Sequence, residues 1–89
     1  MFFSPTAHKE IGALIKTART AAGLAQAELA TKLGYSSPQF ISNWERAESL
    51  PPIHTLPKIA KFTKADYGAF KTILKRDFDR ILEKPVARA

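Results

Sequence analysis

Apolar residues recur at steps of three and four along most of this chain, which is the period of an α-helix that buries one face. The first helix is expected at about 6–22, where Ile11, Ile15 and Ala18 share a face. No segment alternates as a half-buried strand does. The pattern therefore predicts an all-α fold of five helices. The other four are expected at about 26–33, at 38–46, from 54 or 55 onward, and at 65–84.

Residues that start and stop helices agree with this pattern. Ser4-Pro5 suits the beginning of the first helix, because serine accepts a hydrogen bond from the first turn and proline fits there. Ser37 as N-cap with Pro38 at the first helical position predicts the start of the third helix. Gly23 suits a left-handed C-cap after the first helix, and Gly34 ends the second helix. Two short helices separated by a glycine-led turn are the layout of a DNA-reading helix-turn-helix.

The third helix is expected to have an apolar inner face and a polar outer face. Gln39 and Asn43 lie four residues apart and therefore share the outer face, near Ser42. Their amides and hydroxyl can pair with base edges in a major groove. The alternative is the ordinary solvated polar face of an exposed helix. The residues expected toward the core or its rim are Phe40, Ile41 and Trp44.

Composition narrows the classes of protein to which the chain can belong. Its 89 residues fit one small domain. The net charge is +6, with +1 in residues 1–45 and +5 in residues 46–89. A basic surface attracts polyanions, nucleic acid first and anionic membrane second, although many basic domains simply carry solvated charge. The charge alone therefore supports nucleic-acid binding only weakly.

Several kinds of chemistry find no support in the sequence. The absence of cysteine excludes disulfides and thiolate metal sites and favours a reducing cytosol. His8 and His54 are the only histidines and lie far apart, so no metal site is expected. No phosphate-binding glycine loop or nucleophile–base motif is present. We therefore expect that the protein is not an enzyme, has no catalytic residues, and binds no cofactor or small-molecule ligand. No long apolar run or secretory leader is present, so no membrane span is expected.

The last helix is longer than the core of so small a domain can cover, because about 20 helical residues span about 30 Å. We expect residues 1–62 to form a core of four helices. Residues 63–89 would add a helix that packs on this core and pairs with a second copy, followed by a frayed tail at 85–89. The alternative is that the whole apolar stripe is core. Its residues are Tyr67, Phe70, Leu74, Phe78 and Ile81.

The order of these residues resembles the Cro and lambda-repressor type of helix-turn-helix protein, the XRE family. The resemblance extends from about Ile11 to Phe62. It implies a lambda-repressor-like DNA-binding domain whose third helix enters the major groove and whose dimers bind paired half-sites. The matching residues are Ile11, Gly12, Ile15, Arg19, Gln26, Glu28, Leu29, Ala30, Leu33, Gly34, Ile41, Ser42, Trp44, Glu45 and Pro52.

The resemblance also implies roles for individual residues. Gln26 looks like the glutamine that faces a phosphate, and Gln39 and Asn43 look like base-contacting positions. Glu45 looks structural, with a carboxylate that caps or pairs inside the motif. Charge alone makes Lys16, Arg19 and Arg46 candidate phosphate anchors, with solvation as the alternative. Ser37 is also expected at the DNA interface. The residues that look like neighbours of sugar-phosphate groups or base methyls are Pro38, Ser42 and Arg46.

The chain departs from the usual family pattern at three places. The segment from Gly34 to Ile41 is one residue longer than the commonest spacing, which leaves the register of the reading helix open by one position. Ala25 stands where serine or threonine often caps the second helix, a loss of about 1 kcal/mol. Ala47 stands where glycine is common, and a positive φ there costs alanine up to about 1 kcal/mol.

These observations predict sequence-specific binding of double-stranded DNA by a homodimer that regulates transcription, as a repressor. Such a protein is expected in the cytoplasm of a prokaryote, on its nucleoid or encoded by a phage. The alternative from another class is a protein-interaction module, such as an antitoxin or an adaptor, that keeps the fold and binds a partner through the last helix.

Overall fold

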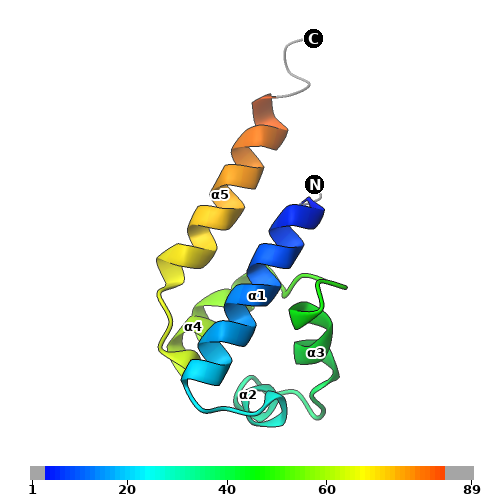
Figure 1. The fold of residues 1–89 in the computed structure, drawn as a ribbon, viewed down its shortest axis with the longest axis vertical. Coiled ribbons are helices and arrows are strands. Elements are labelled where there is room, and N and C mark those ends of the chain that lie inside the picture. Colours follow the sequence, from blue (N-terminus) through cyan, green and yellow to red (C-terminus); the bar gives the residue numbers. More distant parts are fainter. Residues whose placement is uncertain (1–3, 84–89) are drawn as a thin grey trace.

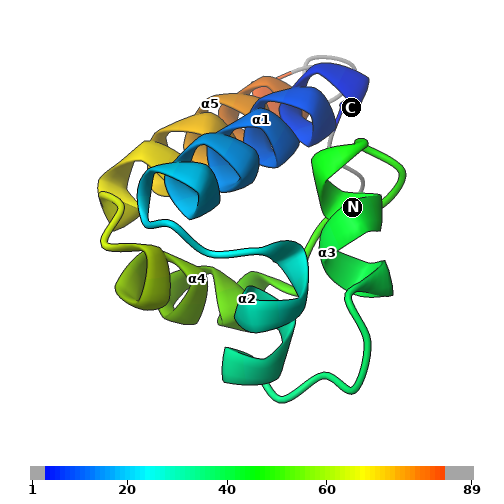
Figure 2. The ribbon, with the colours of Figure 1, turned by 60° about the horizontal axis from the view of Figure 1, so that its bottom comes forward.

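The computed structural model describes the backbone of residues 4–83, and every side chain in that range except those of residues 81 and 83. Residues 4–83 contain helices and no strand, so the predicted all-α fold is confirmed. The two long helices, α1 and α5, lie side by side, and the shorter helices gather below them (Figures 1 and 2). The elements are α1 (Pro5–Ala21), α2 (Gln26–Lys32), α3 (Gln39–Glu45), the 3₁₀ turn η1 (Ile53–Thr55), α4 (Leu56–Thr63) and α5 (Tyr67–Glu83).

The first four α-helices end in the same arrangement of hydrogen bonds. In each, an amide just past the helix donates to a carbonyl five residues earlier, at 2.9–3.1 Å. This arrangement requires one residue in the left-handed conformation after the helix. Gly23 and Gly34 take that place after α1 and α2, with φ of 75° and 90°. Ala47 and Lys64 take it after α3 and α4, with φ of 62° and 59°, so the positive φ considered for Ala47 is present.

The core lies where α1, α3 and α4 meet. Gly12 of α1 allows the closest approach, because a Cβ added to it would lie 2.3 Å from the carbonyl oxygen of Trp44. Phe70 of α5 is fully buried in the same cluster, so the first half of α5 belongs to this core. The buried cluster consists of Ile11, Ile15, Leu29, Ala30, Ile41, Trp44, Leu56, Ile59, Ala60 and Phe70.

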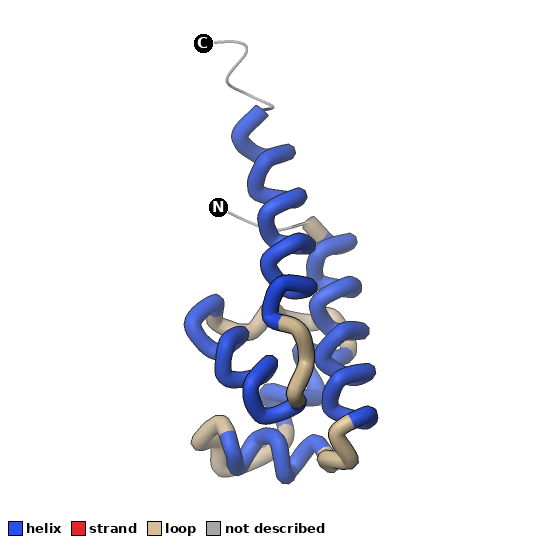
Figure 3. Tube along the Cα trace, turned by 90° about the vertical axis from the view of Figure 1, so that its left-hand side faces the viewer, coloured by secondary structure: helices blue, strands red, loops and turns tan. Residues whose placement is uncertain are grey.

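The second half of α5 is held to the start of α1 by a buried carboxylate. Asp77 accepts hydrogen bonds from the backbone amide and the hydroxyl of Ser4, both at 2.8 Å, and another from Arg80. Ser4 is also the N-cap of α1, as predicted. Beyond this contact α5 continues past the start of α1 (Figures 1 and 3), and Phe78 and Leu82 are 37% and 52% exposed there.

The start expected for the last helix is wrong. α5 begins at Tyr67 rather than at residue 65, because Lys64 is left-handed and the Asp66 carboxylate accepts a hydrogen bond from the new first turn. α4 follows Thr55, which occupies its N-cap position and lies at the expected start; the Thr55 hydroxyl donates to the carbonyl of Pro52 (2.6 Å) within the preceding 3₁₀ turn instead of capping the helix. The helix end expected at residue 84, the tail at 85–89 and the side chain of Ile81 lie outside the described residues.

Candidate nucleic-acid interface

A connected set of polar side chains covers the outer face of α3. The side-chain nitrogen of Gln39 donates to the side-chain oxygen of Asn43 (3.0 Å), and the guanidinium of Arg46 donates to the same oxygen (2.8 Å). Both hydrogen bonds are open to solvent. The amide oxygen of Gln39 and the amino group of Asn43 lie outside these two bonds. The face therefore presents a donor and an acceptor that can meet a base edge.

The start of α3 differs from the expected one. α3 begins at Gln39, one residue later than expected, and Pro38 occupies the N-cap position that was expected of Ser37. The hydroxyl of Ser37 accepts a hydrogen bond from the backbone amide of Gln39 (3.2 Å), so it still stabilises the helix start. Because Ile41 is fully buried, Gln39 and Asn43 point away from the core.

Glu45 links the helices on the inner side of the helix-turn-helix motif. Its carboxylate accepts hydrogen bonds from Nε and Nη2 of Arg19, at 2.6 and 3.0 Å, and from the side-chain amide of Gln26, at 3.0 Å. Nη1 of Arg19 donates to the carbonyl of Leu24 (2.8 Å). These side chains come from α1, α2 and α3, so one carboxylate joins three helices. The expected pairing of Glu45 inside the motif is confirmed.

The pair formed by Arg19 and Glu45 is withdrawn from solvent, with side chains 12% and 4% exposed. The hydrogen bond to Glu45 raises the pKa of Arg19, burial lowers it, and the negative charge of Glu45 raises it again, with a net rise. Arg19 is therefore a permanent cation inside the motif. Its guanidinium already has partners there, and its contact with a phosphate stays a prediction. Lys16, by contrast, is exposed on α1.

Phe40 lies at the rim of the core, one of the two places expected for it. Ile41 and Trp44 are buried as expected, whereas Phe40 is 51% exposed. Its ring lies 4.8 Å from that of Tyr35, which packs edge-on against Trp44 at 5.8 Å. Phe40 is exposed because each residue turns an α-helix by about 100°, which places position 40 on the flank of α3 rather than on its buried face.

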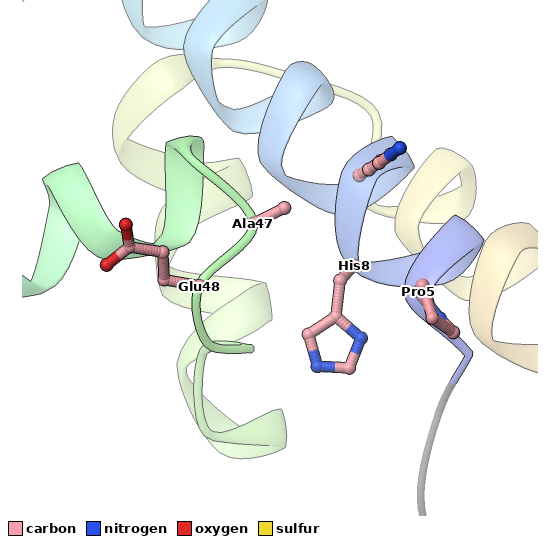
Figure 4. Close-up of a pocket in the computed structure, with 5 residues that line it drawn as sticks. Pro5, His8, Ala47 and Glu48 are labelled. Atoms are coloured by element: carbon pink, nitrogen blue, oxygen red, sulfur yellow. The ribbon is translucent and has the colours of Figure 1, made fainter.

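An open groove of about 290 Å³ separates the end of α3 from the start of α1 (Figure 4). Its charged side chains have opposite signs, so the groove is not a patch of one charge. The methyl group of Ala47 points toward this groove (Figure 4), and Ala47 is partly buried. The lining residues are Pro5, His8, Lys9, Ala47 and Glu48.

The residues expected at a dimer seam lie in different surroundings. Phe70 is fully buried within the protomer, and Tyr67 and Leu74 are partly buried against its core. Phe78 is 37% exposed, and Leu82, which lies beside the expected stripe, is 52% exposed. Among these residues, apolar surface open to a second molecule is therefore concentrated near the end of α5.

Residues 4–83 were also searched for a metal site and for a membrane-spanning helix. No group of three or more histidine, cysteine or acidic side chains in this range is placed to hold a metal ion. None of the helices described is long and apolar enough to cross a membrane.

Residues 15–68, more than half of the chain, match the HTH_3 family model, described as helix-turn-helix. The match runs from the middle of α1 to the start of α5 and includes all of α3. This family is a DNA-binding regulatory domain, not an enzyme family. No curated protein matches the chain. The chain belongs to the XRE and lambda-repressor type of helix-turn-helix proteins.

Proposed function

We propose that this protein binds double-stranded DNA sequence-specifically, inserts α3 into the major groove, and represses transcription by occupying its site. The observation that carries the proposal is the outer face of α3. There Gln39, Asn43 and Arg46 are linked by hydrogen bonds in solvent. The opposite side of the same helix is fixed to α1 and α2 through Glu45. A polar edge on a rigid support is what base readout requires.

The outer residues have chemistry suited to different parts of DNA. Glutamine and asparagine amides form paired hydrogen bonds with N6 and N7 of adenine, so Gln39 and Asn43 are the proposed readers. The guanidinium of Arg46 fits a phosphate or the O6 and N7 atoms of guanine. Its ion pair with Glu48 is exposed on both sides, so exchanging that partner for DNA costs little. The other proposed contacts, to sugar-phosphate groups, are Lys16, Gln26, Ser37, Pro38 and Ser42.

Glu45 prepares Gln26 for a phosphate contact. A side-chain amide nitrogen carries two hydrogens, and Glu45 accepts one of them from Gln26. The second hydrogen is then oriented and can be donated to a phosphate oxygen. Arg19 acts through Glu45 in this arrangement, because it holds the carboxylate that orients the amide.

A duplex selected from a random library and titrated over a salt series tests DNA binding. The logarithm of affinity should fall linearly with the logarithm of salt concentration, by about 0.9 per phosphate neutralised. Replacing Gln39 and Asn43 by alanine should relax sequence preference, at about 1–3 kcal/mol per base contact, with little change in non-specific binding. Thr72→Ala removes an exposed polar side chain from α5 and should change neither quantity. Equal loss of specific and non-specific binding would contradict the assignment of the reading face.

We also propose that two copies pair through the end of α5, which would place two reading helices on paired half-sites. The support is the exposure of Phe78 and Leu82 on the part of α5 that passes the start of α1. Light scattering over a concentration series should show a dimer that Phe78→Ser with Leu82→Ser converts to monomer. Ile53→Ser, which removes an equally exposed apolar side chain elsewhere, should leave the dimer intact. Monomer at every concentration of the unmodified protein would refute this pairing.

The second candidate is a protein-interaction module, and the same exposed end of α5 favours it. It predicts no binding to any duplex, or affinity that does not change with salt. Loss of partner capture on Phe78→Ser, with Gln39→Ala harmless, would identify this function instead of DNA reading.

A further inference from the structure

Phe40 is a half-exposed aromatic side chain at the edge of the proposed reading face. It is 51% exposed, although α3 has buried space for Ile41 and Trp44. Its ring is tilted by 33° on Tyr35 at 4.8 Å, and Tyr35 contacts the buried indole of Trp44 at 5.8 Å. The exposed ring is therefore supported by aromatic contacts that end in the core, and it presents a fixed apolar surface.

The position of Phe40 on the helix decides what this surface can meet. With about 100° per residue, Phe40 lies about 60° around the helix axis from Asn43. Ser42 lies at a similar angle from Gln39, on the opposite flank. When Gln39 and Asn43 face base edges, Phe40 therefore faces the base pairs or groove wall beside them in the same major groove. A major groove is about 12 Å wide, so a helix within it brings both flanks near its walls and floor.

We propose that Phe40 reads the C5-methyl group of a thymine at one position of the DNA site. This inference rests on the proposed DNA-binding function and extends it to a residue with no hydrogen-bonding group. The thymine methyl is the apolar group that base pairs present in the major groove, and phenylalanine is among the side chains that contact it. Polar and basic neighbours on α3, Gln39, Asn43 and Arg46, favour DNA over a protein partner, which would be expected to need a contiguous apolar patch.

Replacement of thymine by uracil tests the contact, because it removes only the methyl group and keeps base pairing. In a duplex selected by the unmodified protein, each thymine is replaced in turn, and affinity is measured for the protein, Phe40→Ala and Phe40→Leu. We expect one thymine whose replacement lowers affinity of the unmodified protein about fourfold, the effect of one buried methyl. Phe40→Ala should bind the thymine and uracil duplexes equally at that position, while Phe40→Leu keeps part of the difference.

The other thymines serve as controls within the same duplex, since Phe40→Ala should leave their responses unchanged. Ile53→Ala, which removes an equally exposed apolar side chain outside α3, should keep the full discrimination. Thermal unfolding of both Phe40 variants is used to check that they fold. Specific binding without any thymine–uracil difference, or a difference that survives Phe40→Ala, would overturn the inference and favour a protein partner for this ring. Failure to bind any duplex would instead overturn the proposed function itself, and this inference with it.

Discussion

Two arginine–glutamate ion pairs adjoin α3, and they differ in exposure. In the first pair, Nε of Arg19 lies 2.6 Å from Oε2 of Glu45, and the two side chains are 12% and 4% exposed. In the second pair, Nη1 of Arg46 lies 3.2 Å from Oε2 of Glu48, and the two side chains are 53% and 56% exposed. The buried pair cannot give up a partner without leaving an uncompensated charge in a poorly solvated place, whereas the exposed pair can. Burial therefore separates the arginine that positions α3 from the arginine that is free to change partners.

Glu45→Ala should give the largest loss of stability. It leaves the guanidinium of Arg19 without its carboxylate and the amide of Gln26 without its acceptor. Removing one member of a buried pair costs about 3–5 kcal/mol of unfolding free energy. Urea unfolding with linear extrapolation measures this loss.

Glu48→Ala is the matched control, because it removes the carboxylate of the exposed pair. Its cost should be about 0–1 kcal/mol. If the two variants lose equal stability, burial does not distinguish the two pairs, and the contrast between a positioning and an available arginine fails.

Gly12→Ala should give the next largest effect, with a sign that helix propensity alone would not predict. Alanine normally stabilises a helix interior by about 1 kcal/mol relative to glycine. Here the new Cβ would lie 2.3 Å from the carbonyl oxygen of Trp44 and 3.1 Å from that of Glu45. Both are backbone atoms, so α1 and α3 must move apart, at a cost of about 2–3 kcal/mol.

Ala13→Gly, at an exposed position on the same helix, measures the propensity effect separately. Both variants are compared by thermal and urea unfolding. A Gly12→Ala protein as stable as the unmodified one would mean that the α1–α3 contact can loosen without cost. The inner side of α3 would then not be the rigid support proposed.

Several parts of this arrangement follow from local sequence. Ile41 and Trp44 were correctly placed inside because burial of one helix face repeats with the helical period. The same period placed Gln39 and Asn43 outside. The pairing of Glu45 was predictable from the resemblance to a known motif, although its partners Arg19 and Gln26 were expected at phosphates.

Other parts depend on contacts between distant segments and have no local signal. Asp77 and Ser4 are 73 residues apart in the chain, and nothing in either neighbourhood marks them as partners. Gly12 reads as an ordinary helical glycine until the carbonyl of Trp44 is placed against it. The apolar character of Phe40 predicts a place in the core or at its rim, but hydrophobicity does not reveal which flank of a short helix the core covers.

Asp77→Ala tests an ion pair whose burial is intermediate between those of the two arginine–glutamate pairs. The loss of stability should also be intermediate. The carboxylate is 3% exposed, whereas its partner Arg80 is 58% exposed. Its loss removes two hydrogen bonds to Ser4 at the start of α1 and should cost about 1–2 kcal/mol.

Hydrogen exchange locates the effect of Asp77→Ala. Amides in the second half of α5 should exchange faster, while those in α4 keep their protection. Asp79→Ala, at an exposed position two residues further along, should change stability by less than about 0.5 kcal/mol. Uniform acceleration over all helices would mean that Asp77 supports the whole core rather than fastening the end of α5.

Ala47→Gly should have the smallest effect and the opposite direction. Ala47 has φ of 62°, a conformation that strains any residue with a Cβ, and its methyl faces the open groove (Figure 4). Glycine removes the strain, so stability should rise by about 0.5–1 kcal/mol. Ala22→Gly, at the end of α1 with φ of −82°, should instead lower stability, because glycine there only adds freedom to the unfolded chain. Since residue 47 lies beyond α3 and leaves the outer face unchanged, the stabilised protein should keep the sequence preference of the unmodified one. A changed preference would show that the turn after α3 sets the angle at which the reading face meets DNA.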